Sequence, residues 1–185
     1  MRIISGVHRG AKLASVPGKN TRPTSDKVKE SLFNIIGPYF NGGNCLDLFA
    51  GSGNVGLEAL SRGFERTIFI ERNGLAVKTI YENIKKLKVD DKSEVLRMDV
   101  RKGLNKLGER GISFSLIFMD PPYNIRDIHI YLDLILKHNL LEENGLLIYE
   151  HDSSVSLETF ENLYIARELT YGSTSITILT KNNPD

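Results

Sequence analysis

The sequence has a single cysteine, no long hydrophobic run and almost no net charge, and each shortage excludes a class of protein. Cys45, the only thiol among 185 residues, cannot form an intramolecular disulfide, and its apolar neighbours predict a buried thiol in a reducing compartment. One cysteine and four scattered histidines offer no metal-ligand spacing, so we expect no metal. No stretch approaches the roughly 20 apolar residues that cross a bilayer, and the start "MRIISGVHRG" lacks a signal-peptide core. These shortages predict one soluble, cytoplasmic, globular protein without a membrane partner.

The net charge of +1 is distributed unevenly along the chain. Residues 1–30 carry a local charge of +5, and the remaining residues therefore carry −4. The bases of this segment, set against Asp26 and Glu30, are Arg2, Arg9, Lys12, Lys19, Arg22, Lys27 and Lys29. A basic arm on a mildly acidic body is typical of a footprint for phosphates, and a solvated N-terminus is the alternative explanation.

Hydrophobic spacing and turn signals predict a helix, a strand and a second helix. The apolar positions of the first helix follow an i, i+4, i+7, i+8 pattern at Val28, Leu32, Ile35 and Ile36. Thr24 or Ser25 can cap this helix. The run 45–49 predicts a strand, and a glycine-rich turn leads from it to a helix over 55–62 that Gly63 terminates.

The alternation of strands and helices then continues to the C-terminus. Further strands are predicted at 67–71, 94–97, 114–119 and 145–150, and further helices from Asn73, near 100–107 and around 127–138. Residues 164–180 predict a closing hairpin around Tyr171 and Gly172. We therefore expect an α/β fold with a Rossmann-like, doubly wound, mostly parallel sheet of seven strands and an antiparallel C-terminal hairpin. The runs "RIIS" and "AKLASV" predict a small N-terminal β-hairpin within a basic arm of residues 1–23, followed by the main domain of residues 24–185.

Acidic residues stand at or near the ends of four successive predicted strands. They are Asp47, Glu71, Asp99 and Asp120. In a doubly wound sheet, ligands bind at the carboxyl ends of the strands, near the point where the strand order reverses. One such acid is commonly only a helix cap, but four along one rim predict a ligand site.

The segment "GSGNVG", residues 51–56, matches the GxGxxG pattern. In NAD-dependent oxidoreductases this pattern holds a pyrophosphate at a helix N-terminus, and an acid about 20 residues later binds the ribose, a role that Glu71 fits. Asp47 opposes a pyrophosphate at this place and favours a cationic ligand without phosphates. S-adenosylmethionine is such a ligand: Asp47 and the glycine loop would hold its methionine part, Glu71 its ribose and Asp99 its adenine amine.

The run "MDPPYN" follows an apolar strand and predicts a stiff loop, because Pro121 and Pro122 cannot continue a ladder of backbone hydrogen bonds. The amino group of a purine is a poor nucleophile because its lone pair is delocalised into the ring. The Asp120 carboxylate and the Pro121 carbonyl would accept its hydrogens and free the lone pair for in-line methyl transfer. Tyr123 would stack on a base swung out of its helix.

These motifs together resemble a known family over nearly the whole chain. "LDLFAGSGNVGLEALSRG", "IERN", "RMD" and "IFMDPPYN" resemble the Rossmann-like S-adenosylmethionine-dependent methyltransferases that act on exocyclic amines. With "RIISGVHRGAKL", "RPTSDKVKESLFNII" and "YGSTSITIL", the sequence is similar to the RsmD family, bacterial 16S ribosomal RNA guanine-N2 methyltransferases. The ordered combination is far more specific than the glycine loop alone.

The resemblance implies methylation of the N2 amine of one guanine in 16S rRNA, with S-adenosylmethionine as donor and no metal. The partner would be the small ribosomal subunit or its assembly intermediate, and we expect a monomer. The residues that it implies for the target amine are Asp120, Pro121, Pro122 and Tyr123. Those for the cofactor are Asp47, Phe49, Ala50, Gly51, Gly53, Glu71, Arg72, Asp99 and Val100. Those for RNA are Arg2, His8, Arg9, Lys12, Lys19, Arg22 and Thr24, with residues 22–24 over either the cofactor or the RNA.

Other functions are weighed against the same residues. A pyrimidine-C5 methyltransferase is excluded because it needs a cysteine near the proline loop, and Cys45 precedes the glycine loop. An adenine-N6 or protein-glutamine methyltransferase stays open, since both act on planar, delocalised amines. An NAD-dependent oxidoreductase is a further alternative, and a non-catalytic RNA-binding module gives no reason for the acidic rim or for Asp120.

Overall fold

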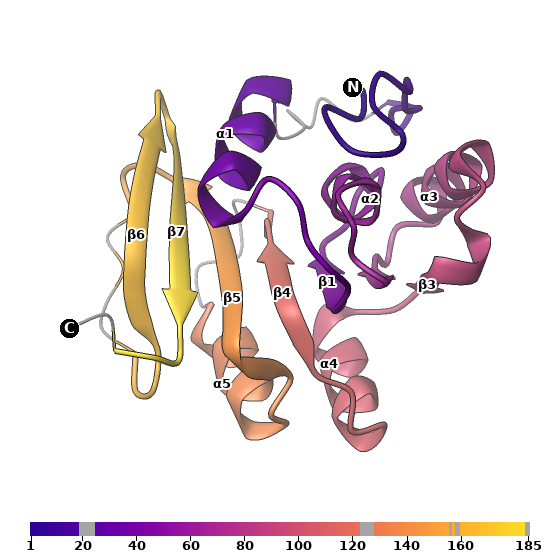
Figure 1. Cartoon of the computed structure of the whole chain (residues 1–185). Helices are drawn as coiled ribbons and strands as arrows, with labels where there is room; N and C mark the ends of the chain where they lie inside the picture. The colour runs from indigo at the N-terminus through magenta and orange to yellow at the C-terminus, as the bar shows by residue number, and fades with distance from the viewer. Residues whose placement is uncertain (19–24, 123–127, 156, 158–159, 184–185) are drawn as a thin grey trace.

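The computed structural model describes residues 1–18, 25–122, 128–155, 157 and 160–183. The strands are β1 (Asn44–Leu48), β2 (Arg66–Ile70), β3 (Ser93–Leu96), β4 (Phe114–Met119), β5 (Leu141–Asp152), β6 (Tyr164–Tyr171) and β7 (Thr174–Thr180). The helices are α1 (Asp26–Ile36), α2 (Asn54–Ser61), α3 (Gly74–Leu87), α4 (Val100–Glu109) and α5 (His129–Lys137), with a short 3-10 turn, η1 (Asp90–Lys92). Figure 1 shows how they surround the sheet.

All seven strands form one sheet in the order β3-β2-β1-β4-β5-β7-β6. Strands β1 to β5 pair in parallel, whereas β7 pairs antiparallel with both β5 and β6. The strand order reverses between β1 and β4, which is where a doubly wound sheet opens for a ligand. The predicted mostly parallel sheet with an antiparallel C-terminal hairpin is confirmed.

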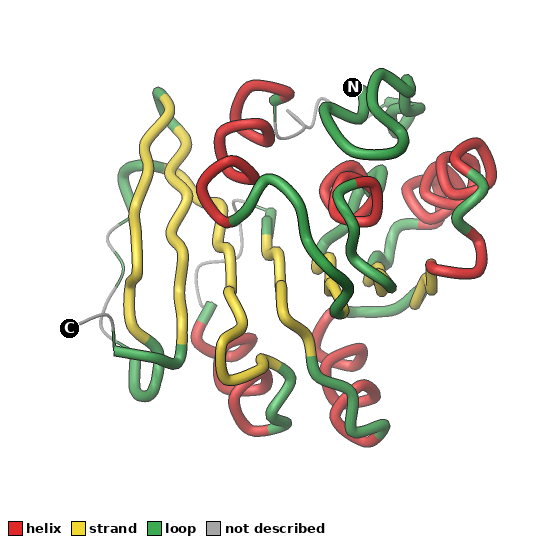
Figure 2. The backbone as a smooth tube through the Cα atoms, viewed as in Figure 1, coloured by secondary structure: helices red, strands yellow, loops and turns green. Residues whose placement is uncertain are grey.

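Helices cover both faces of the sheet, with α1, α2 and α3 on one face and α4 and α5 on the other (Figures 1 and 2). Because the central strands are buried on both faces, their alternate side chains enter different cores. Leu46 and Ile117 belong to the core under α4 and α5, whereas Cys45 and Phe118 belong to the core under α1 and α2. The expected burial of Cys45 is confirmed, and burial raises the pKa of its thiol.

Element boundaries follow the predictions closely, with one clear difference. Ser25 caps α1 by accepting a hydrogen bond from the Val28 amide at 3.2 Å; Thr24, the other predicted cap, lies outside the described residues. Strand β5 is longer at both ends than the predicted run 145–150, because Leu141 pairs with Phe114 before an irregularity in β4 and Asp152 pairs with Thr174 in β7. Long-range pairing therefore extends a strand beyond its apolar run.

The N-terminal segment, residues 1–18, forms a hairpin with less strand pairing than the sequence predicts. Its only regular pairing is an antiparallel bridge between Arg2 and Lys12, flanked by bonds such as that from the Ile3 amide to the Ala11 carbonyl at 2.9 Å. The segment packs against α2, and its side chains Ile3 and Leu13 are buried. It is therefore a packed part of the core rather than a free arm.

No helix in the described part of the chain is both long enough and apolar enough to cross a bilayer.

Candidate active site

The four acids at predicted strand ends lie along one edge of the sheet. Asp47 stands in β1, Glu71 directly follows β2, Asp99 caps α4 after β3, and Asp120 directly follows β4. Since these strands are parallel and adjacent, their carboxyl ends meet at one edge. The reversal of strand order falls between Asp47 and Asp120, so the structure brings the acids to the position where a ligand is expected.

Asp47 is buried beneath the first turn of α2, where its Oδ2 atom accepts a hydrogen bond from the Gly56 amide at 2.9 Å. Burial and the neighbouring charge of Glu71 raise the pKa of the Asp47 carboxyl to about 8. A Cβ at position 56 would collide with Phe69, so a glycine is needed for α2 to lie this close to Asp47. A carboxyl group held in this way gains most from a cation placed beside it.

The glycine loop, residues 51–53, is held by the carboxylate of Glu71. Gly51 and Gly53 adopt φ values of +58° and +77°, which favour glycine, and the Gly51 amide donates to Glu71 Oε2 at 3.0 Å. The other carboxylate oxygen of Glu71 accepts from the Asn73 amide at 2.8 Å. The predicted start of a helix at Asn73 is confirmed, and the Asn73 side chain caps α3 by accepting from the Leu75 and Ala76 amides.

Asp99 and Val100 open helix α4 at the outer part of this edge. The Asp99 carboxylate accepts a hydrogen bond from the Arg101 amide at 3.0 Å and keeps 33% of its side-chain area exposed. Val100 is buried in the core beneath α4. The arrangement leaves part of the Asp99 carboxylate open to a ligand.

Three further predicted cofactor residues flank the strand ends in different ways. Phe49 follows β1 with φ of +59° and meets Tyr131 edge-on, with ring centroids 5.4 Å apart. The Ala50 amide donates to the Ile70 carbonyl at 3.1 Å, which ties the loop after β1 to the end of β2. Arg72 has an exposed side chain.

Asp120 directly follows β4 as a half-buried side chain with other negative charges nearby. Burial, reinforced by the charges of Glu150 and Asp47, holds the pKa of the Asp120 carboxyl well above its ordinary value. Pro121 is buried and Pro122 is exposed, whereas the predicted stacking residue Tyr123 lies outside the described residues. The raised pKa makes Asp120 a stronger proton acceptor than an ordinary aspartate.

Glu150 is a member of this edge that the sequence analysis missed. Met119 pairs with Tyr149 in the parallel register of β4 and β5, so Asp120 and Glu150 are the next residues on adjacent strands. Glu150 raises the pKa of Asp120, and Asp120 in turn contributes to the raised pKa of the Tyr149 hydroxyl. The predicted strand "GLLIYE" ended on this acid, so the rule that selected the other four would have found it.

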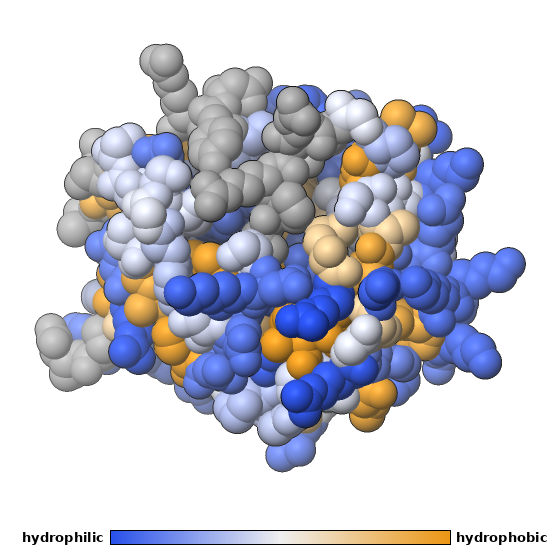
Figure 3. All heavy atoms as spheres, turned by 90° about the horizontal axis from the view of Figure 1, so that it is seen from above, coloured by the Kyte–Doolittle hydropathy of each residue, from blue (hydrophilic) through white to orange (hydrophobic). Residues whose placement is uncertain are grey.

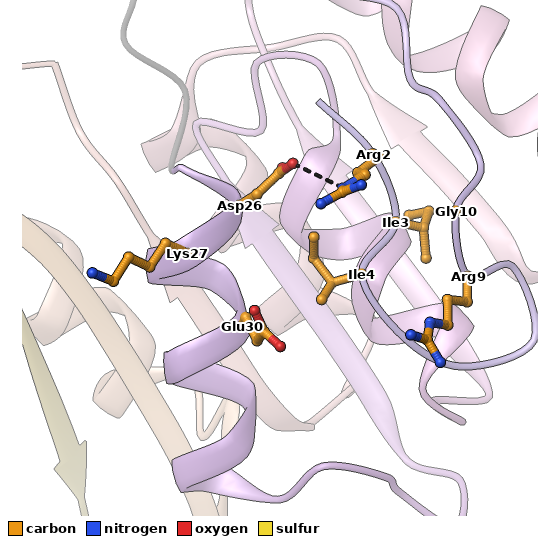
Figure 4. A pocket seen from close by; sticks show the side chains of 8 residues that line it. All are labelled: Arg2, Ile3, Ile4, Arg9, Gly10, Asp26, Lys27 and Glu30. Atoms are coloured by element: carbon orange, nitrogen blue, oxygen red, sulfur yellow. Dashed lines mark ion pairs between the residues drawn. The ribbon is translucent and has the colours of Figure 1, made fainter.

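The predicted RNA-binding residues of the N-terminal segment lie on the same side of the sheet as α1 and α2. Arg2 and Arg9 line a hollow of about 400 Å³ between this segment and α1, and Arg2 forms an ion pair with Asp26 at 3.3 Å (Figure 4). Arg9 and Lys12 are exposed and His8 is half-buried. On this face hydrophilic and hydrophobic residues are intermixed (Figure 3). The other predicted members, Lys19, Arg22 and Thr24, lie outside the described residues.

The basic charge of the N-terminal part of the chain is smaller at the surface than the sequence indicates. Lys29 is completely buried and forms an ion pair with Glu58 at 3.1 Å. Glu58 also accepts a hydrogen bond from Arg62 at 2.7 Å. Lys29 therefore serves the interior, whereas Arg2, Arg9, Lys12 and Lys27 are the exposed bases among the described residues of this part.

The charge of the carboxyl edge decides which cofactor fits it. The buried carboxyl group of Asp47 and the half-buried one of Asp120, with Glu71 bonded to the glycine loop, oppose a pyrophosphate and suit a cation. S-adenosylmethionine carries an ammonium and a sulfonium and matches this edge. Among the residues that the structure describes, no cluster of three or more His, Cys, Asp or Glu side chains is arranged to hold a metal ion.

The fold and this edge define a Rossmann-like methyltransferase, and comparison with solved structures agrees. The structure titled "Putative methyltransferase yhhF from Escherichia coli" superposes with a TM-score of 0.84 at 30% sequence identity, covering 97% of this chain and 96% of that one. The expected fold class is thereby confirmed.

Sequence comparison then gives the family. The family described as "Conserved hypothetical protein 95" matches residues 1–180. The Bacillus subtilis protein named "Putative rRNA methyltransferase YlbH" is 48% identical over 182 residues, 98% of this chain and 99% of that protein. The Haemophilus influenzae protein named "Ribosomal RNA small subunit methyltransferase D" is 35% identical over 176 residues, covering 95% and 91%. The chain belongs to this family, the RsmD family that its motifs indicated, and is an S-adenosylmethionine-dependent methyltransferase.

Proposed function

We propose that this enzyme transfers a methyl group from S-adenosylmethionine to the exocyclic N2 amine of a specific guanine in 16S rRNA. The substrate is the small ribosomal subunit or an intermediate of its assembly, which places the reaction in the cytoplasm. The names of the relatives support an RNA substrate. The observation that carries the proposal is the half-buried carboxyl group of Asp120 after the end of β4, beside the acidic edge that suits a cationic cofactor.

The cofactor would lie across the carboxyl ends of β1, β2 and β3. Asp47 and the glycine loop hold the methionine part, Glu71 the ribose and Asp99 the adenine amine. Phe49, Ala50, Arg72 and Val100 complete the walls. When bound, S-adenosylmethionine supplies an electrophilic methyl group on its sulfonium.

Asp120 acts on the acceptor amine. Its carboxylate and the Pro121 carbonyl accept hydrogen bonds from the two amine hydrogens, which favours a pyramidal nitrogen with a free lone pair. Forming the nitrogen–carbon bond breaks the carbon–sulfur bond and leaves an extra proton on the nitrogen. Asp120 takes this proton, because its environment raises its pKa well above that of an ordinary aspartate.

The RNA would approach over the N-terminal segment. Exposed Arg9 and Lys12, together with Arg2 and His8, offer contacts to phosphates on the side of the sheet that carries α1 and α2. From their place in the sequence we assign RNA contacts also to Lys19, Arg22 and Thr24, and stacking on the flipped base to Tyr123.

The test uses labelled S-adenosylmethionine, the purified enzyme and small subunits from cells that lack this modification. Digestion to nucleosides and mass spectrometry should identify N2-methylguanosine. Asp120→Ala should lower the rate by about 10²- to 10⁴-fold, the contribution of a positioned proton acceptor, while calorimetry shows cofactor affinity largely retained. Asp133→Ala, at an exposed aspartate on α5, is the matched control and should behave as the wild type.

Each other outcome points to a different function. N6-methyladenosine would move the target to adenine, and label in protein would favour a glutamine methyltransferase. Tight NAD binding without S-adenosylmethionine binding would overturn the cofactor assignment. An unimpaired Asp120→Ala enzyme would remove Asp120 from the mechanism.

A further inference from the structure

Asn83 is a buried polar side chain on α3 that touches neither the cofactor acids nor the target amine site. It is 1% exposed and lies between the apolar residues Ile80, Ile84 and Leu87 of the same helix. A buried amide in such a core is costly unless its hydrogen bonds are satisfied. Its partners therefore indicate why an amide stands there.

Within the described residues, Asn83 forms hydrogen bonds with backbone groups of two other segments. Its Oδ1 atom accepts from the Ala14 amide at 2.7 Å, and its Nδ2 atom donates to the Ala14 carbonyl at 3.1 Å. The same Nδ2 atom donates to the Ser52 carbonyl at 3.0 Å. Asn83 thus joins the N-terminal segment to the middle residue of the glycine loop.

Lys29 makes a second connection between the same two regions from α1. Its ammonium donates to the Arg2 carbonyl at 2.7 Å and to Asn54 Oδ1 at 2.6 Å, next to the glycine loop. Glu58 accepts from the Ile4 and Ser5 amides at 2.8 and 3.0 Å, which holds the segment on α2. The glycine loop is therefore held by the N-terminal segment as well as by Glu71.

The loop needs this support because of its backbone conformation. Gly51 and Gly53, on either side of Ser52, have left-handed φ values that a glycine can leave easily. A hydrogen bond to the Ser52 carbonyl restricts the peptide between these two residues. Because the folded protein already restricts this peptide, ordering the loop on a ligand costs less conformational entropy.

We propose that Asn83 is a positioning residue for cofactor binding, which holds the glycine loop in its binding conformation and couples the loop to the N-terminal segment. The inference rests on the proposed cofactor site. Because coupling between sites is reciprocal, a substrate that engages the N-terminal segment changes cofactor affinity through the same contacts.

The first experiment measures binding of S-adenosylhomocysteine and S-adenosylmethionine by calorimetry, without RNA. Asn83→Leu should weaken both at least tenfold, raise the KM for the cofactor and leave kcat at saturating cofactor close to that of the wild type. Thr79→Val is the matched control: Thr79 is equally buried on α3, but its hydroxyl bonds only the Leu75 carbonyl within the helix, at 3.0 Å, so affinity should be unchanged. Equal affinities of the two variants, or a loss confined to kcat, would overturn the inference.

A second measurement uses the wild type and does not depend on a variant that folds. Amide hydrogen exchange at Ala14 should slow severalfold when S-adenosylhomocysteine is added, whereas amides in the β6–β7 hairpin should not change. Unchanged exchange at Ala14 with saturated cofactor would overturn the coupling. A wild type that binds neither compound would instead overturn the proposed function.

Discussion

At the scale of single residues, the edge is built for a ligand at the expense of stability. Asp47 is a buried acid and Asp120 a half-buried one, and no base is among the charges that shift their pKa values. A stability-driven sequence would place neutral side chains there, since an unpaired buried charge is unfavourable. The cationic cofactor proposed to bind beside them would offset this cost.

The Asp47 carboxyl should make both stability and cofactor binding depend on pH. Its pKa rises from 3.8 to about 8 on folding, so its contribution to the free energy of unfolding falls as pH rises from about 4 to 8 and is constant above. Asp47→Asn should remove this dependence and stabilise the free enzyme at pH 9, by up to a few kcal/mol. Urea unfolding at pH 5, 7 and 9 measures the difference between the two proteins.

Cofactor binding should respond to the same group with the opposite sign. A cation favours ionised Asp47, so binding to the wild type should release protons and strengthen as pH rises towards 8. Calorimetry in buffers of different ionisation enthalpy measures the proton release. If Asp47→Asn bound as tightly, with the same proton release, Asp47 would not face the cation.

At the scale of elements, the N-terminal segment has two separate tasks. Its buried side chains Ile3 and Leu13 and its backbone groups serve the core and the glycine loop. Its exposed bases Arg9 and Lys12 are available to a polyanion. Deleting the segment would mix both effects, so its role in binding is better tested by changing charge alone.

Reversing the charge of Arg9 and Lys12 together should weaken association with the small subunit and lower its salt dependence. The slope of log affinity against log salt should decrease by about one for each lost phosphate contact. Lys102→Glu with Lys106→Glu, exposed on α4 at the opposite face, changes the net charge equally and should have a smaller effect. Equal loss in both double variants would mean that only net charge matters and that the segment makes no local contact.

At the scale of the whole molecule, the sheet has two edges that could pair with another chain. Strand β6 has exposed side chains, but its pairing with β7 is irregular between Ile165 and Arg167, and the charged pair Arg167 and Glu168 lies on it. Strand β3 is short, and its Glu94 is engaged by Arg66 and Arg110. Irregular pairing, charges and short length all oppose edge-to-edge association.

The protein should therefore sediment as a monomer of 20.8 kDa over roughly 10 to 100 µM. Replacing Arg167 and Glu168 with threonine should promote self-association, because it removes the charges from the β6 edge. Replacing exposed Lys102 and Lys106 of α4 with threonine is the control and should leave a monomer. A wild-type dimer throughout this range would show that another surface associates.

Much of the candidate site could be predicted because local patterns specify it. Glycine positions, strand ends and the proline pair depend on backbone sterics and on runs of a few residues, so the sequence alone predicts Gly51, Asp47 and Asp120 as site residues. The helix caps at Ser25 and Asn73 follow from the same short-range rules. These features are properties of neighbouring residues in the chain.

Other features depend on residues that are distant in sequence, and only the tertiary structure decided them. The pKa of Asp120 follows from burial and from Glu150, which β-pairing places on the adjacent strand. The sequence counts Lys29 among the bases of a basic arm, but in the fold it is buried in an ion pair because Glu58 lies beside it. The sequence by itself determined the order of strands and helices and the chemistry available at the strand ends. Desolvation, charge coupling and the support of the glycine loop by Asn83 required the packed chain, because each depends on which distant groups exclude water from one another.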